Sequence, residues 1–255
     1  MPFATTAKII NAYYPPEEFE MFIVYGPLGY GKSAYSIKVG VEVLQAIYKV
    51  SEEEAWELIK QFIVFHPKQF FDKIEEIERT VKRVPFLIWD DAGLWLYALD
   101  WNDPFVEAVG KYLNVARTHL ASLICTTPLP KWIFKKLRNF PQATIIKIMK
   151  ETGAPGEARW RRIAQAYISW IHPDMKHSGV RRIYRDYFKC KLPTEFYLEW
   201  YKPLRDTYED MALALMKEQW QKIESKAKVV LLENYPRLQI PSLTIQKYVE
   251  KQTEI

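Results

Sequence analysis

The sequence predicts an α/β protein in which a parallel β-sheet is flanked by helices on both faces. Short apolar segments rich in β-branched residues alternate, over the first 150 residues, with longer segments of helical character. A glycine-rich loop joins the first of these strands to a helix, and a later strand ends in two aspartates. With 255 residues, the chain is long enough to bury a full core.

The individual elements follow from apolar runs and from helix-start signals. Ser51, followed by three glutamates, is typical of a helix N-cap with an acidic first turn, whereas residues 1–20 are expected to be irregular. Strands are expected at Met21–Tyr25, Phe62–His66, Pro85–Asp91, Ala121–Thr126 and Ala143–Lys150. Helices are expected at Ala34–Leu44, from Ser51, from Pro67, at about Pro104–His119 and at Pro130–Arg138.

The composition changes after residue 150. Segments Ala158–Ile171 and Val180–Lys191 interleave aromatic, β-branched and basic residues and predict a hairpin, and a helical region is expected to follow from Pro193 to about Glu233. The sequence therefore predicts two domains. These are a core over residues 1–150 and a hairpin-plus-helix extension over residues 151–255.

A phosphate-binding loop is the most specific motif in the chain. Gly26-x-x-x-x-Gly31-Lys32-Ser33 stands between an apolar strand and a helix, which is the context that a P-loop requires. Lys32 would reach the β- and γ-phosphates of ATP, and the Ser33 hydroxyl would ligate Mg²⁺. Backbone amides of the loop and the helix N-terminus would surround the phosphates. The predicted nucleotide-binding residues are Gly26, Pro27, Leu28, Gly29, Tyr30, Gly31, Lys32, Ser33 and Ala34.

Two acidic residues end the strand that begins near Pro85. Carboxyl ends of parallel strands lie at one rim of the sheet, so Asp90 is expected beside the P-loop as a second Mg²⁺ ligand, in a Walker B element. Asp91, one residue on, is expected to polarise the attacking water. Many ATPases carry Glu at this position, and Asp is shorter by one methylene.

Further groups are candidates for the shell around the γ-phosphate. Thr126 or Thr127 could contact it from the tip of a central strand, although both also suit a simple capping turn. Arg117 and Arg138 precede strands, where a neighbouring subunit's nucleotide could be reached by an arginine finger. Either arginine could instead be a solvated charge at a helix C-terminus.

Positive charge is concentrated in one block of the sequence. Between Lys131 and Lys191 there are 15 Lys and Arg against 4 Asp and Glu, a net charge of +11, whereas the remainder has 21 against 27, a net charge of −6. Such a block predicts a polyanionic partner, or else a solvated face without one. Arginines beside aromatic residues suit phosphate contacts and base stacking on single strands, although aromatic residues in hairpins often pack against each other. The candidate DNA contacts are Arg161, Arg162, Arg181, Arg182 and Arg185.

Other features exclude several classes of protein. No apolar run is long enough to span a membrane, and the N-terminal residues lack the apolar segment of a signal peptide. The two cysteines, Cys125 and Cys190, do not make a disulfide framework, and the four histidines show no metal-ligand spacing. A cytoplasmic protein is the expectation, in the host cytoplasm if the chain is viral.

The segments GPLGYGKS, FLIWDDAG, ARTHLASLICTTP and KKLRN, in this order and spacing, resemble the AAA+ class of P-loop ATPases. They look closest to the small DnaA-like ATPases encoded by archaeal viruses and plasmids. The resemblance covers about residues 20–150 and implies a sheet of order 5-1-4-3-2, ATP hydrolysis between subunits and a role on DNA. The chain departs from the pattern in having Asp91 for Glu and Thr for Asn at the tip of the central strand.

These observations together predict an oligomeric, Mg-ATP-dependent ATPase that acts on DNA in replication initiation, helicase loading or a related task of a mobile element. Alternatives are a DNA-translocating, packaging or virion-assembly ATPase, a small-molecule kinase and a non-catalytic ATP-binding switch. A GTPase is disfavoured because the chain contains no Asn-Lys-x-Asp motif.

Overall fold

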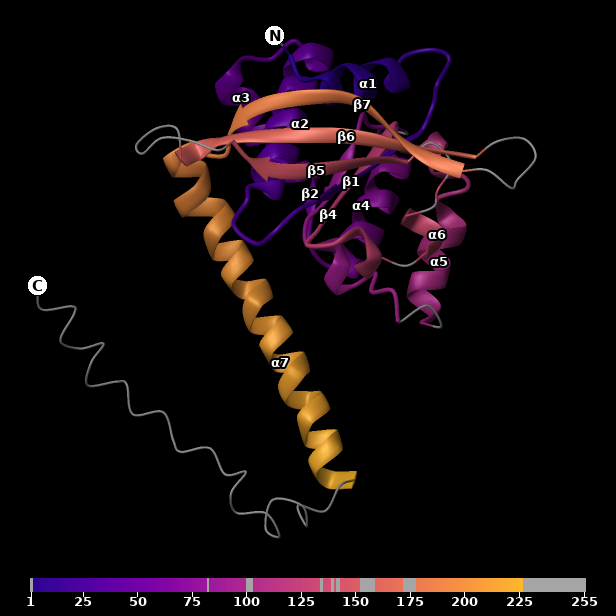
Figure 1. The fold of residues 1–255 in the computed structure, drawn as a ribbon, viewed down its shortest axis with the longest axis vertical. Helices are drawn as coiled ribbons and strands as arrows, with labels where there is room; N and C mark the ends of the chain where they lie inside the picture. The colour runs from indigo at the N-terminus through magenta and orange to yellow at the C-terminus, as the bar shows by residue number, and fades with distance from the viewer. Residues whose placement is uncertain are drawn as a thin grey trace, which may run out of the picture. The chain divides into compact units, whose positions relative to one another are not determined.

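The computed structural model describes residues 2–81, 83–99, 103–133, 135–138, 140, 143–151, 159–171 and 178–226. The chain divides into two compact units, Met1–Tyr197 and Leu198–Ile255. The first unit contains a seven-stranded sheet with helices around it (Figure 1).

The sheet has the order β2-β3-β4-β1-β5-β6-β7. The strands are β1 (Glu20–Tyr25), β2 (Ile63–Val64), β3 (Leu87–Trp89), β4 (Ser122–Thr127), β5 (Thr144–Lys150), β6 (Arg161–Ile171) and β7 (Ser178–Lys189). Strands β1 to β5 pair in parallel, and read from β5 they follow the order 5-1-4-3-2. Strands β6 and β7 pair antiparallel beyond β5, so the sheet is mixed and larger than the expected five-stranded parallel sheet.

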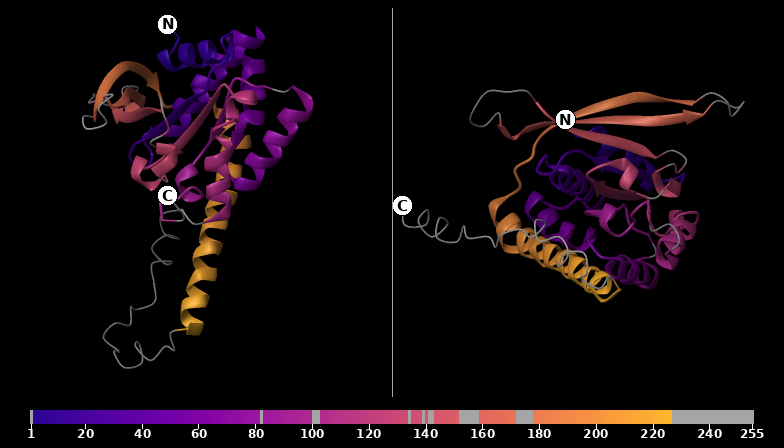
Figure 2. Two further views of the ribbon diagram at one scale, coloured as in Figure 1. Left: turned by 90° about the vertical axis from the view of Figure 1, so that its right-hand side faces the viewer. Right: turned by 60° about the horizontal axis from the view of Figure 1, so that its bottom comes forward.

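Helices lie on both faces of the parallel strands (Figure 2). They are α1 (Ala4–Tyr13), α2 (Lys32–Tyr48), α3 (Glu52–Leu58), α4 (Pro67–Thr80), α5 (Pro104–Tyr112) and α6 (Lys135–Arg138). Short 3₁₀ turns cover Ile59–Phe62, Ala92–Leu94, Ala116–Thr118 and Pro130–Trp132. The expected capping box is confirmed, because Ser51 accepts from the Glu54 amide and the Glu54 carboxylate accepts from the Ser51 amide. Helix α5 ends at Tyr112, seven residues before the predicted end.

Side chains of β1 point alternately to the two faces of the sheet, and each face has its own hydrophobic core. Met21 and Ile23 are fully buried in a cluster with Phe70 of α4 and Val109 of α5. Side chains of successive strand residues point to opposite faces, so Phe22 and its even-numbered neighbours face α2 instead. The two cores hold β1 at the centre of the sheet and α2 directly behind it.

The prediction that residues 1–20 are irregular is wrong for helix α1. This helix buries Thr5, Thr6, Ile9 and Ala12 and packs on α2 and β7. Two of these four inward positions are threonines, so the sequence of α1 lacks the continuous apolar stripe that announces an amphipathic helix.

The predicted domain boundary after residue 150 lies inside a continuous sheet. The hairpin β6–β7 is predicted correctly as an element, but its backbone pairs with β5 from Thr144↔Ile168 to Lys150↔Arg162. The boundary between the two compact units falls between Tyr197 and Leu198 instead. Seven residue pairs join β5 to β6, so the hairpin is part of the first unit. The change in composition after residue 150 does not reveal this pairing.

The second unit contains helix α7 (Lys202–Lys226), which follows a π-helical turn at Phe196–Tyr201. Along α7 the apolar side chains Leu215, Met216 and Trp220 are exposed. No helix among the described residues is both long and apolar enough to cross a membrane. The histidine pair His172 and His177 and the part of the predicted helix beyond residue 226 lie outside the described residues.

Candidate functional site

The P-loop connects the end of β1 to the start of α2. Two of its glycines adopt left-handed backbone conformations, with φ of +73° at Gly29 and +93° at Gly31, which residues with a Cβ atom rarely adopt. Lys32 is only 5% exposed, and its ammonium donates to the carbonyl of Pro27 at 3.3 Å. The loop therefore curls around its own lysine at the N-terminus of a 17-residue helix, where anions are favoured.

A hydrogen-bonded cluster lies at the ends of β3 and β4, beside this loop. Asp90 is 1% exposed, and its Oδ1 accepts from Ser33 Oγ at 2.8 Å and from Thr126 Oγ1 at 2.6 Å. The strand register explains why Ser33, Asp90 and Thr126 lie close together, because Trp89 pairs with Cys125 and Val24 pairs with Thr126. The hydroxyls of Ser33 and Thr126 thus converge on one carboxylate oxygen of Asp90.

Asp91 follows with a left-handed backbone, φ +50°, and is half-buried. Its amide donates to Thr126 Oγ1 at 2.8 Å. The Thr126 hydroxyl therefore donates to Asp90 and accepts from Asp91, so in this structure it orients both acidic residues. Thr127 donates to the carbonyl of Leu129 at 3.1 Å, as a capping turn requires.

The donor set at Ser33 and Asp90 fits Mg²⁺. A hydroxyl and a carboxylate oxygen 2.8 Å apart are the kind of hard oxygen ligands that this ion prefers. No group of three or more His, Cys, Asp or Glu among the described residues could hold a metal ion. An ion held here would draw its remaining ligands from phosphate and water, which is how Mg²⁺ is commonly bound in phosphoryl-transfer sites.

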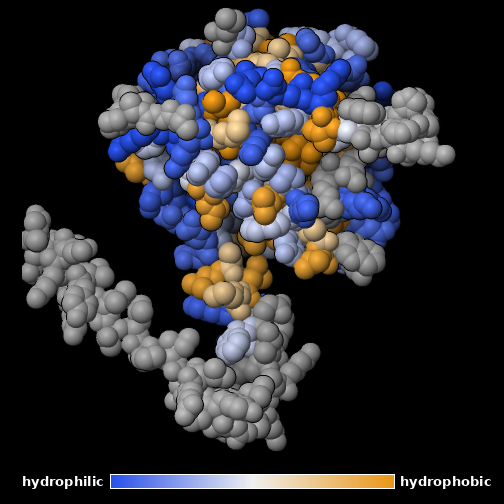
Figure 3. All heavy atoms as spheres, viewed as in Figure 1, coloured by the Kyte–Doolittle hydropathy of each residue, from blue (hydrophilic) through white to orange (hydrophobic). Residues whose placement is uncertain are grey.

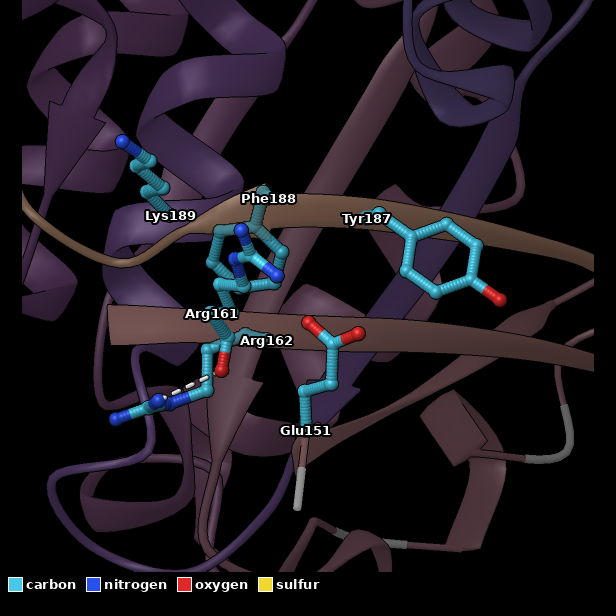
Figure 4. Close-up of a pocket in the computed structure, with 6 residues that line it drawn as sticks. All are labelled: Glu151, Arg161, Arg162, Tyr187, Phe188 and Lys189. Carbon is cyan, nitrogen blue, oxygen red and sulfur yellow. Dashed lines mark hydrogen bonds between the residues drawn. The ribbon is translucent and has the colours of Figure 1, made fainter. Parts of the chain in front are cut away.

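Strand β6 reaches the P-loop through Arg162. This side chain is 5% exposed; its Nε donates to the carbonyl of Tyr30 at 3.0 Å, and its Nη1 donates to the carbonyl of Arg159. Nη1 also donates to the carbonyl of Arg161, as Figure 4 shows. Lys150 of β5 lies over the Tyr30 ring, with its Nζ 4.7 Å from the ring centroid. The prediction that Arg162 contacts DNA is corrected, because its guanidinium is buried against the P-loop.

Cys190 completes the contact between the hairpin and the loop. A Cβ atom built on Gly31 would lie 2.5 Å from the Cβ of Cys190, so a larger residue at Gly31 would clash with it. The thiol of Cys125 in β4 is fully buried, and burial raises its pKa to about 12. Of the two free cysteines, only Cys190 is partly exposed.

A buried polar network ties β7 to α1 and α2. The carboxylate of Asp186 accepts from the Tyr35 hydroxyl at 2.6 Å and from the amide of Ala4 at 2.9 Å. Thr5 Oγ1 lies 2.6 Å from the Tyr35 hydroxyl and 2.7 Å from that of Tyr184. Burial, with smaller contributions from Tyr184 and Asp186, raises the pKa of Tyr35 well above its ordinary value. Tyr35 lies on the first turn of α2, so this network anchors the hairpin next to the P-loop.

The remaining arginines fall into two groups. Arg117 is exposed before β4, at the end of the parallel strands opposite the P-loop, and the side chain of Arg138 lies outside the described residues. On the hairpin, the exposed Arg161, Arg182 and Arg185 share one face, whereas Arg181 lies on the other.

Comparisons with known proteins show few relatives. No family model matches the chain. The chain is similar to a protein of Sulfolobus spindle-shape virus 1 described as uncharacterized protein B-251, with 29% identity over 212 residues that cover 83% of each chain. The N-terminal domain of zonular occludens toxin from Neisseria meningitidis matches with a TM-score of 0.38 and 14% identity, over 71% of this chain and 97% of that domain. Neither description names an AAA+ or DnaA-like ATPase.

Three residues at the P-loop were missed by sequence reasoning in this role: Lys150, Arg162 and Cys190. They lie 120 to 160 positions after Tyr30 and Gly31, and no motif marks them. Parallel pairing of β5 with β1 brings Lys150 to the loop, and the antiparallel pairing of β6 with β5 and of β7 with β6 brings Arg162 and Cys190 there.

Proposed function

We propose that the chain is a Mg-ATP-dependent ATPase that acts on DNA as an oligomer. The observation that carries this proposal is the 2.8 Å hydrogen bond between Ser33 and Asp90, directly beneath a glycine-rich loop with a buried lysine. A hydroxyl from the loop and a carboxylate from a neighbouring strand are the two protein ligands that a P-loop ATPase uses for Mg²⁺. The sequence places them 57 residues apart, and the fold brings them together.

Each residue of the cluster then has a role. Lys32 and the loop amides bind the phosphates, and Ser33 and Asp90 hold the ion, which supplies charge neutralisation on the β- and γ-phosphates when bound. Asp91 accepts a proton from, and orients, the attacking water. Thr126 fixes the positions of Asp90 and Asp91 relative to each other through its two hydrogen bonds.

The placement of Arg117 supports the oligomeric part of the proposal. It precedes β4, at the opposite end of the parallel strands from its own P-loop, so we assign it to the nucleotide site of a neighbouring copy. We assign the same role to Arg138 as the alternative finger, since it also precedes a parallel strand.

The DNA part of the proposal is supported by the basic hairpin and by the viral origin of the relative. We favour replication initiation or helicase loading as the task, which the resemblance of the motifs to those of DnaA-like ATPases implies. DNA packaging or virion assembly is the second candidate, because a viral relative fits either task.

The test is phosphate release from ATP, with and without single- or double-stranded DNA, over a range of protein concentrations. We expect turnover that rises with DNA and more than linearly with protein. Lys32→Ala should abolish turnover, and Asp91→Asn should bind ATP but lose turnover by about 100-fold or more. Lys111→Ala on the exposed surface of α5 is the matched control and should behave as the parent.

Two results would contradict the proposal. Hydrolysis by Asp91→Asn at the parental rate would remove Asp91 as the base. Turnover indifferent to DNA and to protein concentration would favour a kinase or a monomeric switch over an oligomeric DNA-dependent ATPase.

A further inference from the structure

The face of β5–β7 that points away from α1 and α2 is strongly basic. The pairing register places the side chains of alternate residues on it, and the face is toward the viewer in Figure 1. Its exposed basic residues are Lys147, Arg161, Arg182, Arg185 and Lys189. Among the described residues, the acidic side chain beside them is that of Glu151, at the edge of the face.

Aromatic and apolar side chains lie among these charges. Tyr187 is 59% exposed and Tyr167 is half-buried. Ile163 and Met149 lie beside Tyr187 across the strands, so the surface alternates hydrophilic and hydrophobic patches (Figure 3). Arg185 Nη1 donates to the Tyr187 hydroxyl at 3.4 Å, and its Nε donates to Gln165 Oε1 at 3.0 Å. These bonds hold the ring and the guanidinium side by side on the open strand.

A hollow of about 410 Å³ lies at the end of this face nearest the P-loop. Figure 4 shows the Tyr187 ring and the side chains of Arg161 and Glu151 around it. Lys189 and Phe188 of β7 line its other side, and Arg162 passes below it toward the loop. The hollow thus combines an exposed aromatic ring with three cationic side chains and one carboxylate.

We infer that this face binds single-stranded nucleic acid, with one nucleotide seated in the hollow between Tyr187, Arg161 and Lys189. A base stacks on the ring of Tyr187, and the phosphates on either side of it contact the guanidinium and ammonium groups. Glu151 accepts a hydrogen bond from an amino group at the edge of the base. The strand continues along the sheet over Arg185 and Arg182.

Single-stranded rather than double-stranded nucleic acid fits the shape and chemistry of the face. Stacking on an exposed tyrosine requires an unpaired base, because the bases of a duplex already stack on each other. A broad three-stranded surface presents too wide a front for the major groove, which admits a helix or a two-stranded ribbon. Open sheets that carry aromatic and basic side chains are a recurrent way to bind single strands.

The inference deepens the DNA part of the proposed function and is independent of ATP. The test is therefore fluorescence anisotropy without nucleotide, using a labelled 20-nucleotide strand and the 20-base-pair duplex of the same sequence. We expect the single strand to bind at least tenfold more tightly. Tyr187→Ala should weaken this binding about tenfold, whereas Tyr187→Phe, which keeps the ring, should bind as the parent.

The charge contacts are tested by the salt dependence of the same binding. Each of Arg161→Gln and Arg185→Gln should lower the slope of log K against log salt by about 0.7. Arg181→Gln is the matched control, since it removes an exposed arginine from the opposite face of the same strand and should leave the slope nearly unchanged. Tyr14→Ala removes an exposed tyrosine elsewhere in the unit and should not alter binding.

Equal affinity for strand and duplex would overturn the inference, as would parental binding by Tyr187→Ala. Failure to bind either nucleic acid would overturn it together with the DNA part of the proposed function. Lys32→Ala separates the two sites, because this variant should lose ATP and still bind the single strand as the parent does. Loss of both ligands in Lys32→Ala would contradict an ATP-independent face.

Discussion

The two faces of strands β5–β7 both carry charged and aromatic residues, but on one face several of these residues are buried, whereas on the other most are exposed. On the inner face, Asp186 is buried and accepts a hydrogen bond from Tyr35 of α2, and Arg162 donates to the P-loop carbonyl of Tyr30. On the outer face, Arg161 and Tyr187 are exposed and line an open hollow. Arg161 and Arg162 are neighbours in the sequence and differ only in the face that the strand gives them.

This contrast shows what a charge count can and cannot identify. A basic block of sequence predicts a polyanion surface, but in a strand every second side chain points inward. Of the five arginines predicted to contact DNA, one is buried and one lies on the other face, so three remain on the proposed binding face. The inner half of the hairpin supports the P-loop, and the outer half is open to a ligand.

The largest expected difference between the faces is in stability. Asp186→Ala removes the acceptor of the buried Tyr35 hydroxyl and of the partly buried Ala4 amide, so we expect it to lower the free energy of unfolding by about 3 kcal/mol. Arg185→Gln, one residue earlier and exposed, should change it by less than about 0.5 kcal/mol. Urea denaturation of both variants measures the difference, and similar losses from the two would erase the distinction between the faces.

The next effect is on nucleotide affinity. Arg162→Gln removes a charged donor that holds the Tyr30 carbonyl, so the P-loop should be less well ordered and the Kd of a fluorescent ATP analogue should rise about tenfold. Arg161→Gln should leave this Kd unchanged, because its side chain faces away from the loop. If both substitutions weaken ATP binding equally, the cause is the loss of positive charge in general, and Arg162 has no particular role at the loop.

The smallest effect concerns the two cysteines. N-ethylmaleimide should modify one thiol of the folded chain, that of Cys190, because burial raises the pKa of Cys125 to about 12 and keeps its thiol protonated. The adduct would press on Gly31, so we expect a few-fold loss of ATP affinity, less than that from Arg162→Gln. Mass spectrometry and titration of the modified protein measure this, with Cys190→Ser as the protected control. Unchanged ATP affinity of the modified protein would show that the P-loop accommodates the adduct and that Cys190 does not restrict it.

Much of the parallel part of the fold could be predicted because its signals are local. Five apolar runs mark β1 to β5, and the P-loop and the Asp90–Asp91 pair mark the ends of β1 and β3. The convergence of Ser33 with Asp90 follows from the rule that parallel strands end at the same rim. Helix α1 was missed because two of its buried positions are threonines, whose hydroxyls are satisfied only by partners far along the chain.

Residue spacing alone indicated the P-loop motif, the residues proposed to hold magnesium and the hairpin, since each depends on neighbours within a few residues or on a single strand. The tertiary structure decided that the hairpin extends the central sheet, and with it which arginines are buried and which are open. Pairing between β5 and β6 is a long-range choice of partner and register. A shift of one residue in that register would exchange the faces of Arg161 and Arg162, and nothing in the local sequence specifies it.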